Sequence, residues 1–286
     1  MFFFLYFCGF HQEEYYMERN KISISGDLGS GKTVLARKIS EKMGIPIISV
    51  GGIQRQLAQK YGMDTTTFNK YMETHPEIDL ECDNMVSEYG RSAEPLILDS
   101  RLAWHFVPHS LKIHLICNKA VAAERIFKDR VRENEKYSNV EETYKSMVER
   151  RNSEIKRFKQ QYHVDINDLN NYDVVIDTSF ITPDEVFAKA WEAIENWQKE
   201  TAYRKIWLSP KNLMPTRLDD DANEMVVVTR VDGNFYLLSG HGKVSKALVE
   251  NCILLPVSYA SGNIPVVTPS KLIISQWEKK HGFQFF

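Results

Sequence analysis

The sequence predicts an α/β protein with a five-stranded parallel sheet, followed by a second, small α+β domain. From about residue 21 to residue 199, short apolar runs alternate with segments whose apolar residues lie three or four apart. Continuous apolar strands that alternate with helices are typical of a parallel sheet covered on both faces. After about residue 203 this alternation gives way to short strands around a hairpin signal. The length of 286 residues also favours about two domains.

Five apolar runs define the strands of the first domain. They are residues 22–25, 45–50, 96–99, 113–117 and 174–177. Gly44, followed by Pro46, is predicted to end the first helix. Ser138 and Glu141 have the spacing of a capping box, which predicts a long helix from there to about residue 162. Thr182 is predicted to cap a further helix, with a proline at its first position.

Turn signals define the second domain. Its strands are expected at residues 206–208, 225–230, 235–238 and 253–257. The sequence Val231-Asp232-Gly233-Asn234 predicts a hairpin between the middle two strands. A glycine-rich turn at residues 239–243 opens a helix, and a closing helix is expected after the cap Thr268.

Three segments follow from these patterns: 1–16, 17–200 and 201–286. The apolar stretch at residues 1–10 is too short to span a bilayer, and it lacks the basic start and cleavage site of a secretory signal. We interpret residues 1–16 as a non-native or disordered extension, with Met17 as the natural start.

The composition is that of a globular protein, with 43% hydrophobic and 26% charged residues. Lys and Arg number 36 against 38 Asp and Glu, and a net charge of -2 argues against a nucleic-acid-coating protein. The four cysteines show neither zinc-type spacing nor a disulfide framework, which indicates a reducing, cytoplasmic setting. We expect no nucleic-acid partner, no membrane association and a monomer.

The strongest motif is a phosphate-binding loop that fits G-x-x-x-x-G-K-[ST], with a predicted strand before it and a helix after it. Backbone N–H groups in such a loop point at an anion, and the following helix adds its positive end. Lys32 is expected to reach the β- and γ-phosphates of ATP, and Thr33 to bind Mg²⁺. The motif therefore predicts a P-loop NTPase fold. Its predicted ATP-binding residues are Gly26, Asp27, Leu28, Gly29, Ser30, Gly31, Lys32 and Thr33.

Arginines follow this loop at positions where open parallel sheets bind ligands. Arg55 lies one turn into the helix after the second strand, and Arg101 lies just beyond the third strand. Arg150, Glu154 and Arg157 are spaced to share one face of the long helix. Phosphoryl transfer between two phosphorylated molecules needs positive charge on both sides and a lid that excludes water.

Less specific interpretations compete with this one. The group at positions 150, 154 and 157 also fits a salt-bridge ladder on a solvent-exposed helix face. Arg125, Arg132 and Arg151 are interpreted as solvated positions on helices. Arg130 lies before the charged loop at residues 133–139, which we interpret as a lid.

Residues of about 20–190 resemble the cytidylate kinases, in particular the shorter type common in archaea. The matching stretches include ISISGDLGSGKTVLARKISEKMGIPIISVGGIQRQLA, LILDSRLAW and ERRNSEIKRFKQQYHVDINDLNNYDVVIDTS. The resemblance implies that Arg55, Arg101, Arg150, Glu154 and Arg157 bind the acceptor nucleotide, and that Lys32, Arg101 and Arg130 are catalytic. Gly52, Ser100 and Arg151 depart from the family's pattern on the acceptor side.

Residues of about 203–260 resemble the sulfiredoxin-like and ParB-like domain family, in the stretch RKIWLSPKNLMPT and the turn SGHGK. The resemblance implies a second anion site at Gly240, His241, Gly242 and Lys243. The alternative is a tight turn that only closes a small domain. The turn contains no cysteine, which argues against sulfiredoxin activity.

The sequence thus predicts a nucleoside monophosphate kinase that uses ATP and Mg²⁺ and converts CMP or dCMP to CDP or dCDP. Two alternatives stay open. One is a kinase for another nucleotide or a small phosphorylated acceptor, because Gly52 and Ser100 depart from the family's pattern. The other is a non-catalytic nucleotide sensor that signals through the C-terminal domain.

Overall fold

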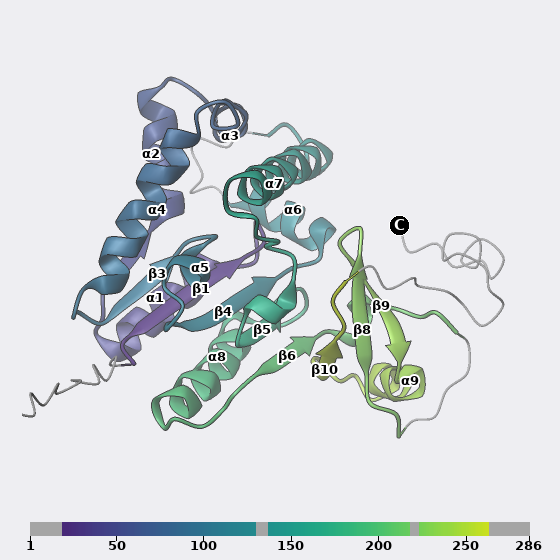
Figure 1. Ribbon diagram of the computed structural model, residues 1–286. Coiled ribbons are helices and arrows are strands. Elements are labelled where there is room, and N and C mark those ends of the chain that lie inside the picture. The colour runs from purple at the N-terminus through teal and green to yellow at the C-terminus, as the bar shows by residue number, and fades with distance from the viewer. Residues whose placement is uncertain (1–18, 130–136, 218–222, 263–286) are drawn as a thin grey trace, which may run out of the picture.

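The strands of the described residues lie in one ten-stranded sheet, in the order β2-β3-β1-β4-β5-β6-β10-β8-β9-β7 (Figure 1). The structure is a computed structural model, and it describes residues 19–129, 137–217 and 223–262. The strands are β1 Lys21–Gly26, β2 Ile47–Ser49, β3 Leu96–Asp99, β4 Leu111–Ile116, β5 Val174–Asp177, β6 Lys205–Leu208, β7 Leu213–Met214, β8 Val227–Val231, β9 Asn234–Ser239 and β10 Leu255–Tyr259.

Nine α-helices and two short 3₁₀ turns connect these strands within the described residues. The helices are α1 Lys32–Met43, α2 Val50–Lys60, α3 Thr65–Tyr71, α4 Pro76–Arg91, α5 Ala103–Phe106, α6 Lys119–Lys128, α7 Val140–Tyr162, α8 Pro183–Gln198 and α9 His241–Val249.

The first five strands are parallel neighbours, which confirms the predicted α/β class. Strands β1, β3, β4 and β5 are almost wholly buried because helices cover both faces of the sheet, whereas the edge strand β2 is half-buried. In β5, Val174 and Ile176 face the helices α1 and α8, whereas Val175 faces the opposite side, toward α5 and the end of α7. Helices α2, α3 and α4 stand at the β2 edge (Figure 1).

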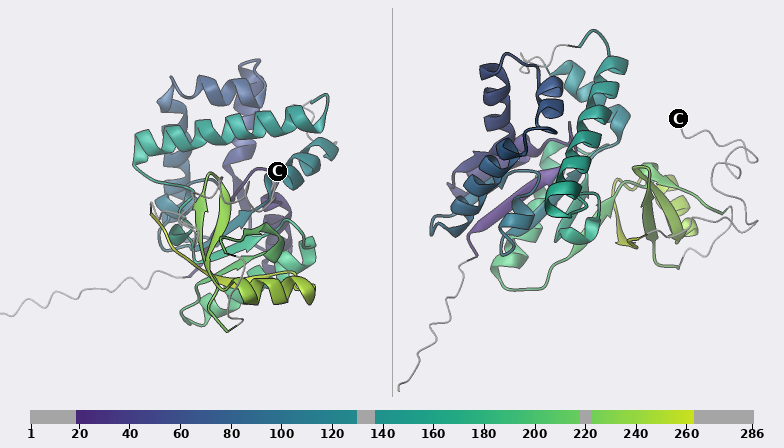
Figure 2. Two further views of the ribbon diagram at one scale, coloured as in Figure 1. Left: turned by 90° about the vertical axis from the view of Figure 1, so that its right-hand side faces the viewer. Right: turned by 45° about the horizontal axis from the view of Figure 1, so that its top comes forward.

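The sheet is larger than the five strands predicted. Strand β6 pairs in parallel with β5, and β10 pairs antiparallel with β6, with Leu255 opposite Leu208. Helix α8 therefore connects one more pair of parallel strands, β5 and β6, and the sheet continues across residue 200. Beyond β10, strands β7 to β9 and helix α9 form a small lobe beside the parallel strands (Figure 2).

The predicted helix ends are mostly observed. Gly44 closes α1 in the left-handed conformation at φ 70, and Thr182 forms a complete capping box with Glu185. The capping box predicted for Ser138 is wrong by one residue. Asn139 caps α7 and its side chain accepts from the Glu142 N–H, whereas the Ser138 N–H donates to the Glu142 carboxylate.

One apolar cluster joins the parallel strands to the C-terminal lobe. It contains Tyr172 just before β5, Val175 of β5, Leu208 of β6, and Phe235 and Leu237 of β9. Because these side chains share one core, the lobe and the parallel sheet are held together by apolar packing as well as by strand pairing.

The predicted extension at residues 1–16 and the closing helix after Thr268 lie outside the described residues. Within the described part of the chain, no helix combines the length and the apolar composition that a membrane crossing requires.

Leu208→Ala tests whether the core is shared. Leu208 is fully buried, so its truncation should lower the free energy of unfolding by about 2–5 kcal/mol. Chemical denaturation followed by both fluorescence and circular dichroism should show one transition, shifted as a whole. The matched control Leu248→Ala removes an exposed side chain and should change stability by no more than about 0.5 kcal/mol. Two separate transitions, only one of them shifted, would contradict a common core.

Candidate active site

The predicted phosphate loop lies between the end of β1 and the start of α1. Two of its glycines are required by close contacts with the neighbouring backbone. A Cβ atom at Gly26 would lie 2.2 Å from the Leu115 carbonyl oxygen, and one at Gly29 would lie 2.9 Å from the Ala122 carbonyl oxygen. Gly31 precedes the helix at φ 85, a left-handed conformation that favours glycine. The motif is therefore folded as a tight loop at a helix N-terminus, the form that binds phosphate.

Lys32 folds back over this loop. Its ammonium group donates to the carbonyl oxygens of Gly26 at 3.1 Å and of Asp27 at 2.9 Å. Burial, together with the nearby Arg101 charge, lowers the pKa of Lys32 well below its usual range, although Asp99 and Glu154 act in the opposite direction. An anion in the loop would attract this lysine and raise its pKa again.

A cleft of about 70 Å³ brings the loop and most of the predicted acceptor residues together. Lys32 and Thr33 line one side, and Arg55, Arg101 and Arg150 line the other parts of the wall. The same cleft is lined by Glu154 of α7 and by Asp99 and Ser100 at the end of β3. The arginines and the phosphate loop therefore face one small space, as phosphoryl transfer requires.

Glu154 holds the arginines of the cleft in place. Its carboxylate accepts from Arg101 Nε at 2.9 Å and lies 3.6 Å from Arg150 Nε. Burial raises the pKa of Glu154, but the opposite effect of Arg101, Arg150 and Arg151 is larger. The resulting pKa is about 2, below the ordinary value. Arg101 also donates through Nη1 to the Gly26 carbonyl oxygen at 2.9 Å, which links Glu154 to the phosphate loop.

The alternative of an exposed salt-bridge ladder on α7 is wrong, because all three side chains of the trio are buried. Arg157, however, does not line the cleft. It pairs with Asp79 of α4 and donates to Asn69 of α3 at 3.0 Å. Arg157 therefore connects α7 to both α3 and α4.

Two carboxylates of α4 in the cleft wall were missed at the sequence level. Asp79 and Asp83 are buried one turn apart. Burial raises the pKa of Asp83 to about 7, even though Tyr162 donates a hydrogen bond to it at 2.6 Å. The sequence contained one indication of this burial. Each carboxylate directly follows an inward-facing residue of α4, Ile78 or Cys82, and therefore lies next to the apolar face of the helix.

Arg125 and Arg151 are not solvated, contrary to expectation. Arg125 donates to the Thr178 carbonyl oxygen at 2.7 Å and to the Ser179 carbonyl oxygen at 3.2 Å. Arg151 lies 3.4 Å from the Asp27 carboxylate and donates to Asn167 Oδ1 at 3.1 Å. Helix periodicity alone could not reveal these contacts, because each partner comes from a distant part of the chain. Arg130 and Arg132 lie outside the described residues.

The cleft offers oxygen ligands that suit Mg²⁺. The Thr33 hydroxyl and the Asp99 carboxylate both line it, and Ser49 donates to Asp99 at 3.3 Å. The described residues contain no cluster of three His, Cys, Asp or Glu side chains that could hold a metal ion.

The turn at residues 240–243 already holds a carboxylate. Glu224 accepts from the Gly240 N–H at 3.1 Å and pairs with Arg217 at 2.7 Å. His241 is buried and its Nε2 accepts from the Thr216 N–H at 3.0 Å, whereas Lys243 is exposed. An external anion would have to displace Glu224, and the second anion site stays a prediction.

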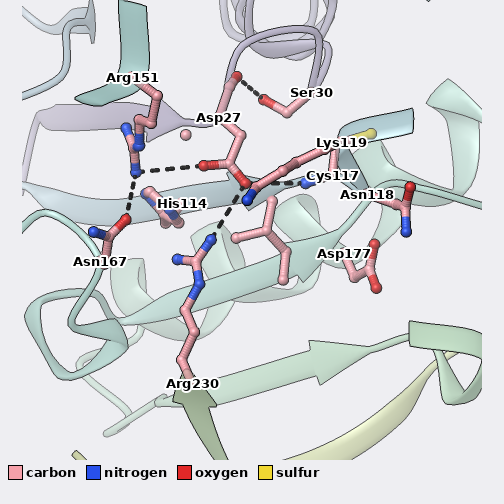
Figure 3. A network of polar contacts seen from close by, with 12 residues as sticks. Asp27, Ser30, His114, Cys117, Asn118, Lys119, Arg151, Asn167, Asp177 and Arg230 are labelled. Carbon is pink, nitrogen blue, oxygen red and sulfur yellow. Dashed lines mark hydrogen bonds and ion pairs between the residues drawn. The ribbon is translucent and has the colours of Figure 1, made fainter. Parts of the chain in front are cut away.

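A second, larger cavity of about 1080 Å³ lies between α7, the ends of β4 and β5, and the β8–β9 hairpin. Asp27, Arg151 and Arg230 lie in its wall. The phosphate loop therefore faces the small cleft on one side and the C-terminal lobe on the other. Figure 3 shows the second of these sides, where Asp27 lies near Arg230 of β8.

Comparison with known proteins places this site in a family. The cytidylate kinase-like family matches residues 21–180, more than half of the chain. The chain belongs to the cytidylate kinase-like family. The cytidylate kinase of Pyrococcus furiosus is 40% identical over 176 residues, which cover 61% of this chain and 88% of the relative. The cytidylate kinase of Methanocaldococcus jannaschii is 40% identical over 183 residues, covering 62% and 99%.

Among solved structures, a gluconokinase from Sinorhizobium meliloti is similar over 64% of this chain and 95% of its own, with 15% identity and a TM-score of 0.44. The family match confirms the predicted enzyme class, so this cytidylate kinase-like protein is a nucleoside monophosphate kinase. The match ends at residue 180, and strands β6 to β10 lie beyond it.

Glu154→Gln should lower the free energy of unfolding at neutral pH. The same variant should lose less of that free energy than the wild type when the pH falls. The folded pKa of Glu154 is about 2, against an ordinary 4.5, so its carboxylate stabilises the fold above pH 4.5. That contribution, about 3 kcal/mol, disappears as the pH falls from 4.5 towards 2. Urea denaturation across this range checks it, with the exposed Glu149→Gln as the control. Parallel stability curves for wild type and Glu154→Gln would contradict the assignment.

Binding of ATP should be accompanied by proton uptake at Lys32. Burial and the nearby charge of Arg101 lower the pKa of Lys32, and a bound triphosphate would raise it again. Calorimetry at about pH 8.5 in two buffers of different ionisation enthalpy measures the protons taken up. Lys32→Arg keeps a permanent charge and should lose the uptake. Equal uptake by the two proteins would show that another group titrates.

Proposed function

We propose that the protein transfers the γ-phosphate of ATP to CMP or dCMP. One observation carries this proposal: a single cleft is lined by Lys32 and Thr33 of the phosphate loop and by Arg55, Arg101 and Arg150 from three other elements. Two phosphorylated ligands that meet there would have positive charge on both sides. The names of the relatives, cytidylate kinases, support the choice of acceptor.

The reaction needs alignment and charge compensation more than a strong base. An oxygen of the acceptor phosphate attacks the γ-phosphorus in line, the bond to the β,γ-bridging oxygen breaks, and ADP leaves with that electron pair. Lys32 binds the donor phosphates from the loop. Arg101 is placed between the loop and the acceptor side, because it donates both to the Gly26 carbonyl oxygen and to Glu154.

Carboxylates fit the recognition of the acceptor base. Glu154, Asp79 and Asp83 lie in the wall of the cleft beyond the arginines. A carboxylate accepts from the amino group of cytosine, which uracil lacks. This difference supports CMP over UMP. Arg55 and Arg150 would then hold the acceptor phosphate.

Mg²⁺ fits the hydroxyl of Thr33 and the carboxylate of Asp99, both in the cleft. When bound, it would add positive charge beside the donor phosphates. The chain's own contribution is to place these two oxygens in the cleft that Lys32 also lines.

The proposal is tested by assaying purified full-length protein with MgATP and a panel of CMP, dCMP, UMP, AMP and GMP. CMP or dCMP should give the highest kcat/KM. Lys32→Ala should lower kcat/KM by at least about 10²-fold, because it removes a charge that contacts the transferred group. The control Lys42→Ala removes an exposed lysine of the same helix and should leave activity unchanged. Absence of turnover with every acceptor, or full activity of Lys32→Ala, would refute the proposal.

A further inference from the structure

We propose that the C-terminal lobe completes the ATP site: Arg230 of β8 neutralises Asp27 inside the phosphate loop and thereby sets the affinity for ATP. The inference rests on the proposed kinase function. It assigns Arg230 as a positioning residue, because its guanidinium acts through Asp27 and not on the substrate.

Three groups hold the carboxylate of Asp27 (Figure 3). The Cys117 N–H donates to it at 3.3 Å, Arg151 Nη2 lies 3.4 Å away, and Arg230 Nη2 lies 3.9 Å away. The Asp27 and Arg230 side chains are only 16% and 11% exposed. Figure 3 shows the two arginines reaching the carboxylate from opposite sides, one from α7 and one from the lobe.

A carboxylate at this position opposes phosphate binding unless it is compensated. The backbone of Asp27 belongs to the anion-binding loop, since its carbonyl oxygen accepts from Lys32 and from the Ser30 hydroxyl. Burial raises the pKa of Asp27, but the opposite effect of Arg151 and Arg230 is larger and brings the pKa to about 2. The carboxylate is therefore charged at neutral pH. Its negative charge would repel a triphosphate a few ångströms away. Two arginines convert this local charge from negative to positive.

Arg151 cannot provide this compensation alone, because its charge is shared. Its Nη1 lies 3.6 Å from Glu154, and its Nη2 also donates to Asn167. Arg230 has no such competing partner: among the described residues, Asp27 is the one carboxylate within ion-pair distance of it. Its Nε and Nη1 are buried without hydrogen-bond partners. Burying a guanidinium in this way is costly unless the charge has a use.

The lobe is fixed where it can deliver this charge. The turn after β8 contacts the start of α6, where Lys119 Nζ donates to the Asp232 carbonyl oxygen at 3.4 Å. Phe235 of β9 lies under the Arg230 guanidinium, 5.2 Å from it. The shared apolar core holds the same hairpin from behind, through Phe235 and Leu237. Arg230 is thus a preorganised contact between the lobe and the phosphate loop.

Arg230→Gln in the full-length protein tests the inference. KM for ATP should rise about tenfold, and calorimetric binding of MgATP without acceptor should weaken by the same factor. KM for CMP should change by less than about twofold, because the acceptor side is untouched. Arg230→Lys should have an affinity for ATP between those of the wild type and Arg230→Gln. The control Arg217→Gln removes an arginine of the same lobe that pairs with Glu224 instead, and it should bind ATP as the wild type does.

A double-mutant cycle separates this role from a structural one. In an Asp27→Asn background the compensation is no longer needed, so adding Arg230→Gln should change ATP affinity by less than about twofold. An equal loss in both backgrounds, or ATP affinity unchanged in Arg230→Gln, would overturn the inference. Neither result bears on the proposed function. That proposal fails if the wild type phosphorylates no nucleoside monophosphate, or if Lys32→Ala keeps full activity.

Discussion

The buried carboxylate of Glu154 is the interaction on which the cleft depends. A site for two phosphorylated ligands must gather several guanidinium groups, which repel one another while the ligands are absent. Glu154 lies next to Arg101, Arg150 and Arg151, and this keeps their positions fixed at the end of β3 and along α7. Bound phosphates then find the charges already placed, so little reorganisation is needed.

The phosphate loop uses the same principle with a second carboxylate. Asp27 has a pKa of about 2, as Glu154 does, and burial opposes both of these low values. The arginines overcome burial in each case. Arg151 lies between the two carboxylates and is in ion-pair range of both. The cleft and the loop are therefore parts of one electrostatic network, which continues into the C-terminal lobe through Arg230.

Local patterns predicted what depends on local chemistry. The glycine spacing around Lys32 gave the phosphate loop, the apolar runs gave the five parallel strands, and strand ends gave Arg55 and Arg101. Partners that are distant along the chain could not be predicted. The pairing of β6 with β5 needs knowledge of which sheet edge is free, and the contact of Arg230 with Asp27 joins residues about 200 positions apart.

The continuity of the sheet from β5 through β6 to β10 limits how this chain can be shortened. Removal of everything after α8 would leave β5 as an outer strand, with its N–H and C=O groups open to another chain. It would also remove Leu208, Phe235 and Leu237 from the apolar cluster that contains Tyr172 and Val175. Such a fragment would be a candidate for self-association through its exposed edge, although it would retain the whole family-matched segment.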